Sequence, residues 1–204
     1  MLDAKILRDS PARKVKQLKA NERSFHVISN DEQKLYLLAA PQPLQDVAIL
    51  MLETSMRCNE VYQLRRQDVS LEKGYLKVYK AKTRNSVQKV YLSDEARKVL
   101  RYRLNRFKGE NLFPQNDIDG NPPTNSLDKA HLATVRNLKM KFRFYDARHT
   151  FARRAVENGV DLLVLASILG HSNLKVVMRY AHPSEGFKAD AIKRMEQNRK
   201  AKAV

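Results

Sequence analysis

Two arginines in this chain of 204 residues stand at helical spacing from another polar residue. Arg57 precedes Glu60 by three positions and Tyr145 precedes Arg148 by three, so each pair lies on one face of its predicted helix. Arg57 also follows one of the most apolar stretches of the chain, where an arginine without a role would be costly. Each pair alone is compatible with a surface contact, but guanidinium groups also bind paired anionic oxygens.

An imidazole and a phenol stand near the end of the chain at a fixed separation. His171 directly follows Leu169-Gly170, a predicted helix stop, where it can face a pocket with little side-chain freedom to lose. Tyr180 comes nine residues later. Lys82 occupies the predicted tip of a β-hairpin, where a solvated turn residue is the ordinary interpretation. Any one of these residues is more often structural than catalytic, so their combination has to carry the argument.

Signatures of cofactor and metal sites are missing from the sequence. It contains neither GxxxxGK[ST] nor GxGxxG, and its five histidines form no pair at i, i+4 spacing. Residues 117–120 resemble part of a calcium loop, but the glycine spacing is wrong. The single cysteine, Cys58, excludes an internal disulfide and a metal site built from cysteines. We therefore expect neither a metal nor a cofactor.

The charge indicates the class of partner. The chain has 39 Lys and Arg against 22 Asp and Glu, a formal net charge of +17, which attracts polyanions such as nucleic acid. Ribosomal and histone-like proteins share such a charge, so it specifies no activity. The longest apolar runs, 35–40 and 47–52, are too short to span a bilayer, and no stretch of signal-peptide type opens the chain. We expect a cytoplasmic protein without membrane contact.

Hydrophobic periodicity predicts the elements that position these residues. Period-two alternation on both sides of residues 82–86 predicts a β-hairpin of strands 75–80 and 87–92. A loop rich in Pro, Gly, Asn and Asp is expected at 114–125. Apolar spacing, together with capping residues such as Ser29, Ser93 and Asp161, predicts helices. These helices cover 29–39, 44–56, 59–64, a stretch from 94 to about 107, 126–138, 144–158, 162–169, 174–180 and 186–200. The fold class is mainly α with a small antiparallel β-sheet, an α+β fold.

Four segments together resemble one protein family. They read SMRCNEV at 55–61, AKT at 81–83, YDARHTFA at 145–152 and ILGHSNLKVVMRYAH at 168–182. Their order and spacing are similar to the catalytic domain of the tyrosine recombinases, also called phage-type integrases. The likeness covers about residues 25–183, and its last segment is the most specific, since helix, glycine stop, histidine, short helix and tyrosine recur there at fixed distances.

The resemblance implies a domain plan and a set of site residues. It implies a catalytic domain at 25–185, followed by a C-terminal helix and tail at 186–204, while a basic composition poor in large apolar residues favours a linker or arm at 1–24. A separate helical DNA-binding domain usually precedes the catalytic domain in this family. The implied site consists of Arg57, Lys82, Tyr145, Arg148, His171 and the nucleophile Tyr180, with Glu60 and His149 in supporting positions. Tyr145 departs from the family pattern, which usually has histidine there.

The same resemblance implies the reaction. Tyr180 would attack a backbone phosphorus of double-stranded DNA, forming a 3′-phosphotyrosyl link and freeing a 5′-hydroxyl. Arg57 and Arg148 would stabilise the transition state, and Lys82 would protonate the leaving oxygen. Tyr145, a poor base at neutral pH, would donate a hydrogen bond to the phosphate or to Glu60. The protein would belong to a bacterial or archaeal cell or be encoded by a phage. Recombination would require four protomers assembled on DNA.

Three other functions stay open at this point. The chain could be a DNA-binding descendant of a recombinase that Tyr145 has made inert. It could relax supercoils as a type IB topoisomerase does, with the same nucleophile and no choice of site. A metal-dependent nuclease is the weakest alternative, and full activity in EDTA would remove it.

Overall fold

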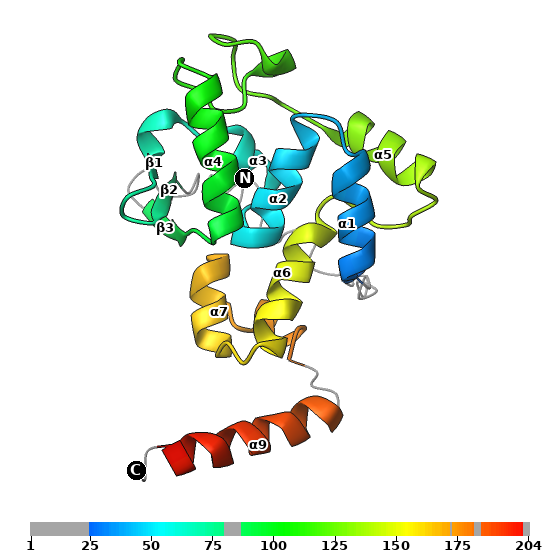
Figure 1. Ribbon diagram of the computed structural model, residues 1–204, viewed down its shortest axis with the longest axis vertical. Coiled ribbons are helices and arrows are strands. Elements are labelled where there is room, and N and C mark those ends of the chain that lie inside the picture. The colour runs from blue at the N-terminus through cyan, green and yellow to red at the C-terminus, as the bar shows by residue number, and fades with distance from the viewer. Residues whose placement is uncertain (1–24, 80–86, 172, 182–184, 202–204) are drawn as a thin grey trace, which may run out of the picture.

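The helix α2 (Leu44–Thr54) lies at the centre of the fold in the computed structural model, which describes residues 25–79, 87–171, 173–181 and 185–201. It contacts α1 (Asn30–Ala39), α3 (Cys58–Tyr62), α4 (Asp94–Arg106) and α6 (Asp146–Glu157). Figure 1 shows these helices around α2. Eight of its residues are buried, which agrees with a sequence that is apolar almost all round. The helix ends two residues before the predicted end, because Ser55 adopts a left-handed conformation.

The remaining described elements follow the predicted order. The helices are α5 (Asp128–Asn137), α7 (Leu162–Leu169), α8 (Lys175–Met178) and α9 (Glu185–Ala201), with short 3-10 turns η2 (Arg66–Asp68) and η3 (Gln115–Asp117). Asp161 caps α7 by accepting hydrogen bonds from two backbone amides, and Gly170 ends that helix with φ 65°. Both features were predicted from residue type. Predicted starts at 126 and 144 were two residues early; at α6 the Asp146 carboxylate accepts the Arg143 amide at 2.8 Å, ahead of the first helical turn.

The antiparallel sheet has one strand more than the sequence predicted. The hairpin of β2 (Tyr75–Tyr79) and β3 (Val87–Tyr91) pairs Leu76 with Val90, both buried against the core. β1 (Val69–Ser70) adds a third strand beside β2. Two residues are too few for alternation to be recognised, which is why β1 was missed. The predicted class, mainly helical with a small antiparallel sheet, is confirmed.

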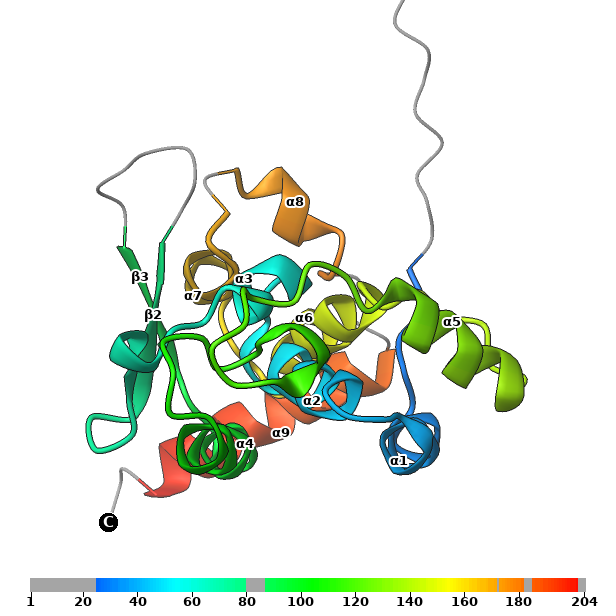
Figure 2. The ribbon, with the colours of Figure 1, turned by 90° about the horizontal axis from the view of Figure 1, so that it is seen from above.

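A second, smaller core joins α6, α7 and α8. Its buried members are Ala152, Leu165, Ala166, Leu169, Val177 and Tyr180. Figure 2 shows α7 next to β2 and β3, with α8 on the same side of the molecule. The side chain of Gln88 joins β3 to α7, since its amide nitrogen donates to the backbone oxygens of Ser167 at 3.2 Å and Ile168 at 2.6 Å.

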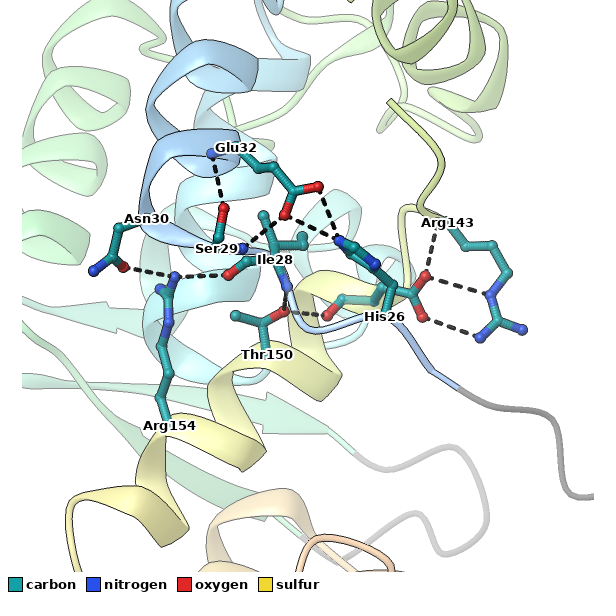
Figure 3. Close-up of polar contacts among 9 residues, drawn as sticks. His26, Ile28, Ser29, Asn30, Glu32, Arg143, Thr150 and Arg154 are labelled. Carbon is teal, nitrogen blue, oxygen red and sulfur yellow. Dashed lines mark hydrogen bonds and ion pairs between the residues drawn. The ribbon is translucent and has the colours of Figure 1, made fainter. Parts of the chain in front are cut away.

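The segment that enters the domain is fastened to α6. The backbone amide of Ile28 donates to Thr150 Oγ1 at 2.9 Å, and Arg154 donates to the Ile28 oxygen and to Asn30 Oδ1, both at 3.0 Å. His26 contacts Glu32, which closes a capping box with Ser29 at the start of α1. Figure 3 shows these contacts converging between α1 and α6. The first described residues are therefore fixed in position.

The last helix, α9, lies apart from the others in Figure 1. It covers the predicted range 186–200 with one additional residue at each end. Over the part of the chain that the structure describes, no helix combines the length and apolar character needed to cross a bilayer. The predicted arm at 1–24 falls outside the described residues, and the predicted domain limits stay predictions.

Candidate active site

Arg57 begins α3 and faces an open cleft. Its Nη1 donates to Glu60 Oε1 at 2.7 Å, and its backbone amide donates to Glu60 Oε2 at 2.8 Å. This is the predicted i, i+3 pair. The pKa of Arg57 is raised: burial opposes the charge, but the hydrogen bond and the negative charge of Glu60 outweigh burial, with Tyr145 adding to them. The guanidinium therefore stays charged, and Glu60 fixes its direction.

Arg148 lies on α6 and is buried, with 3% of its surface exposed. Its guanidinium donates to the backbone oxygen of Ser55 and, at 2.6 Å, to that of Leu169. Nη2 also lies 3.4 Å from His171 Nε2. Burial lowers the pKa of Arg148 below its ordinary value, and the neighbouring charge of Arg57 lowers it further. The charges of Arg57 and Arg148 therefore interact with each other.

His171 is positioned by the end of α7. The left-handed Gly170 turns the chain, and the His171 amide donates to the Ala166 oxygen at 2.9 Å, which closes the helix end. Gln88, on β3, donates to the backbone oxygens of Ser167 and Ile168 in the last turn of the same helix. The hairpin, the end of α7 and Arg148 thus meet at His171.

A cleft of about 640 Å³ opens where these elements meet. Arg57 and Glu60 line it from α3, and His171 lines it from the turn after α7. Lys77 and Tyr79 line it from β2. Arg57 and Lys77 bring positive charge to the cleft from two elements, and Glu60, which also lines it, is paired with Arg57; an anionic ligand suits this arrangement.

Tyr180 follows α8 and is 3% exposed. Its hydroxyl lies 2.6 Å from His149 Nδ1. Burial raises the pKa of Tyr180, and the charges of Arg179 and Arg148 oppose this without cancelling it. Burial also lowers the pKa of His149 to about 4, and the charge of Arg179 adds to the effect. Both groups are neutral at pH 7, so the two share a hydrogen bond whose direction is set by the imidazole nitrogen that carries the proton.

Tyr145 stands immediately before α6, at the rim of the site, and is 39% exposed. It interacts with Arg57, where it contributes to the raised pKa of the guanidinium. Its ring meets that of His149 edge to face, with centroids 5.1 Å apart. Tyr145 therefore links the open cleft to the buried histidine.

The structure brings together seven of the eight predicted site residues. They are Arg57, Glu60, Tyr145, Arg148, His149, His171 and Tyr180. Lys82 lies outside the described residues, so its position stays a prediction. Within the described ranges, no three His, Cys, Asp or Glu side chains gather into a group that could hold a metal ion.

Sequence reasoning missed three residues that build the site. Ser55 supplies a carbonyl to Arg148, Gln88 ties the sheet to α7, and Phe25 stacks on the His149 ring at 5.0 Å. Gln88 and Phe25 act across long separations in the chain, which leave no local pattern. Ser55 was recognised only as the first residue of the segment SMRCNEV, at the end of an apolar helix, without a role of its own.

Comparisons with known proteins agree on one family. A model described as the phage integrase family matches residues 19–186. The integrase of Escherichia phage P2 is 28% identical over 184 residues, covering 90% of this chain and 51% of that protein. The tyrosine recombinase XerA of Saccharolobus solfataricus is 26% identical over 134 residues, covering 65% of this chain and 43% of that protein. The chain spans about half the length of these relatives.

Solved structures share the fold. The Tn1549 transposon integrase in complex with a circular intermediate DNA superposes with a TM-score of 0.72 at 17% identity, covering 87% of this chain and 68% of that one. The catalytic domain of bacteriophage HP1 integrase gives 0.62 at 22% identity, covering 83% of this chain and 95% of that one.

Proposed function

We propose, from the premise that this chain belongs to the phage integrase family, that it cleaves and rejoins DNA strands through Tyr180 in site-specific recombination. The observation that supports this most is the convergence of two guanidiniums, from the start of α3 and from α6, beside His171 and within electrostatic reach of Tyr180. The segments that carry them lie far apart in the chain. A fold that only binds DNA needs no such arrangement.

The phosphate site is proposed between Arg57 and Arg148. The guanidinium of Arg57 is held by Glu60 and that of Arg148 by two backbone carbonyls, so both are fixed before a substrate arrives. Fixed donors stabilise the charge that grows on non-bridging oxygens without reorganising during the step. His171, beside Arg148, would donate a further hydrogen bond to the same phosphate.

In the proposed step, the Tyr180 phenol loses its proton to water as its oxygen bonds to phosphorus, and the bond from phosphorus to the 5′-oxygen breaks. The 3′-phosphotyrosyl link keeps the bond energy, so the reverse attack by a 5′-hydroxyl needs no ATP. Lys82 would give the leaving oxygen its proton. Tyr145 would hold Arg57 and donate to the phosphate, as a phenol is a weak base at pH 7.

The partner is proposed to be double-stranded DNA, on which four copies of the chain would assemble in the cytoplasm. The net charge of +17 supports a polyanionic partner, and the neighbour from Tn1549 was solved with DNA. The part of each relative that this chain matches is about half of its length, and we propose that this part supplies the strand-transfer chemistry.

Covalent trapping tests the proposal. The chain is incubated in EDTA with nicked duplex fragments that tile the DNA on either side of its coding sequence, and adducts are resolved on a denaturing gel. The wild-type chain should form adducts, and Tyr180→Phe should form none while binding the same DNA within a few-fold. Adducts that persist in Tyr180→Phe would identify another nucleophile. Relaxation of supercoiled DNA without any preferred site would favour a topoisomerase-like activity instead.

A further inference from the structure

The hydroxyl of Tyr180 has a hydrogen-bond partner on the helix that carries Arg148. His149 is the next residue along α6, and its Nδ1 lies 2.6 Å from the phenol oxygen. Both side chains are buried, with 8% and 3% of their surfaces exposed. A hydrogen bond of this kind fixes the rotation of the phenol and the distance of its oxygen from α6.

The element that carries Tyr180 gives it little support of its own. α8 has only four residues, and Tyr180 follows it in a turn whose backbone amide bonds to the Val177 oxygen. A short helix of this length is weakly stabilised by its own hydrogen bonds. The position of the phenol oxygen therefore depends on contacts from other elements. The hydrogen bond to His149 is the contact that involves this oxygen itself.

Phe25 in turn fixes His149. Its ring stacks on the imidazole with centroids 5.0 Å apart and meets the Tyr180 ring edge to face at 5.3 Å. The Arg179 guanidinium lies 5.5 Å from the same phenylalanine ring. Figure 3 shows how the residues just after Phe25 are tied to α6 through Thr150 and Arg154. The segment that carries Phe25 is therefore attached to the same helix as His149.

We propose that His149 is a positioning residue for Tyr180, and that Phe25, from the segment that enters the domain, holds the imidazole in place for it. This inference rests on the proposed function, because it concerns how the proposed nucleophile reaches the phosphate. His149 accepts the phenol hydrogen bond and keeps the oxygen beside Arg148 and Tyr145. A displacement of about 1 Å in a reacting group can cost on the order of 100-fold in rate.

Two substitutions separate positioning from packing. His149→Leu removes the acceptor and keeps an apolar side chain in the site. His149→Asn retains an acceptor, since its Oδ1 branches from the same carbon position as Nδ1 of the imidazole. His131→Leu is the matched control: His131 is also buried, bonds to the Tyr36 hydroxyl at 2.9 Å, and meets the Phe142 ring at 5.5 Å, away from Tyr180.

The first measurement needs no activity. In nitrogen NMR of the DNA-free chain, His149 should be the neutral tautomer protonated on Nε2, and Tyr180→Phe should shift its Nδ1 resonance. Phe25→Leu should broaden or shift the same resonance, whereas His131 should not respond to either change. A Nδ1 resonance of His149 that ignores Tyr180→Phe would overturn the inference and leave the proposed function standing.

The second measurement is the single-turnover rate of adduct formation on a nicked duplex that the wild-type chain cleaves, with DNA affinity measured in parallel. His149→Leu should slow the rate on the order of 100-fold at unchanged affinity. His149→Asn should recover most of that loss, Phe25→Leu should fall between them, and His131→Leu should match the wild type.

A His149→Leu chain that reacts as fast as the wild type, or faster, would show that the contact with His149 does not place the phenol for attack, and would overturn the inference. A His149→Asn chain as slow as His149→Leu would overturn it too. Failure of the wild-type chain to form any adduct would instead overturn the proposed function, and the inference with it.

Discussion

The guanidinium of Arg148 donates a hydrogen bond to the backbone oxygen of Ser55, which stands 93 positions earlier in the chain. Ser55 has φ 61°, a left-handed conformation that ends α2 and turns its carbonyl toward α6. Two positions later Arg57 begins α3. One turn of backbone thus accepts the hydrogen bond of the buried Arg148 and leads directly to the half-buried Arg57 at the start of α3.

This relationship predicts different consequences for the two arginines. Arg57→Ala and Arg148→Ala should each slow cleavage by on the order of 100-fold or more, as the loss of a donor to the transition state does. Arg148→Ala should also lower the free energy of unfolding by at least about 2 kcal/mol, because two buried carbonyls lose their donor. Arg57→Ala should leave unfolding almost unchanged. Chemical denaturation and adduct kinetics of both variants check this, and equal losses of DNA binding and cleavage would reduce the arginines to ordinary phosphate contacts.

Substitutions of Tyr145 test the departure from the family pattern, which usually has histidine at this position. Tyr145→Phe should cost about 1 kcal/mol, or a few-fold in cleavage, if its hydroxyl supplies only one hydrogen bond. Tyr145→His places a group with an ordinary pKa near 6.5 at the rim of the site. Cleavage should stay equal or rise, and become dependent on pH between about 6 and 8. The pH profile of the adduct rate decides the matter, and loss of adducts in Tyr145→Phe but not in Tyr180→Phe would make Tyr145 the nucleophile.

The buried histidine beside Tyr180 predicts how stability changes with pH. His149 has a pKa of about 4 in the folded chain, lowered mainly by burial, against about 6.5 when unfolded. Above pH 6.5 neither state binds the proton, whereas between 6.5 and 4 only the unfolded state does. Stability is therefore complete above pH 6.5 and falls as the pH drops toward 4, by on the order of 3 kcal/mol in all. Denaturant titrations at pH 7, 6 and 5 should show this slope, and His149→Asn should show a shallower one; equal slopes would mean that His149 is not buried as a neutral group.

The parts of the site that the sequence could predict are those that local chemistry decides. Asp161, Gly170 and the spacing of Arg57 from Glu60 act within one helical turn, and each was placed correctly from residue type alone. The Tyr75–Tyr91 hairpin was predicted because two strands of five residues show alternation, while the two residues of β1 show none.

The parts that could not be predicted depend on distant partners. Gln88 is a polar residue in a strand, and nothing near it in sequence indicates the end of α7. Phe25 follows a basic stretch that favours a linker, yet it stacks against a histidine more than a hundred positions away. Arg103 belongs to α4, a helix that apolar spacing predicted, but at its own position a charged side chain favours solvent. It is instead fully buried.

Outside the site, we expect substitution of Arg103 to have the largest effect on the free energy of unfolding. Its guanidinium donates to Asp46 at 2.6 Å, Asp117 at 2.6 Å and Gln42 at 2.7 Å. The Phe113 ring lies 4.7 Å from the guanidinium carbon. Arg103→Met keeps much of the packing but leaves the carboxylate of Asp46 buried without its counterion.

Removing one partner of a buried ion pair typically costs about 3 to 5 kcal/mol, and we expect Arg103→Met to lower the free energy of unfolding by that amount. Adding Asp46→Leu should recover a large part of the loss, because no unpaired charge then remains at the centre of the pair. Lys98→Ala is the control, since it breaks an ion pair of 2.6 Å with Glu95 in which both side chains are mostly exposed, and it should hardly change stability. Denaturant unfolding of the four proteins measures each step. If Arg103→Met and Lys98→Ala behaved alike, solvent would have to reach Asp46, and burial of the pair would not be what holds α2 against α4.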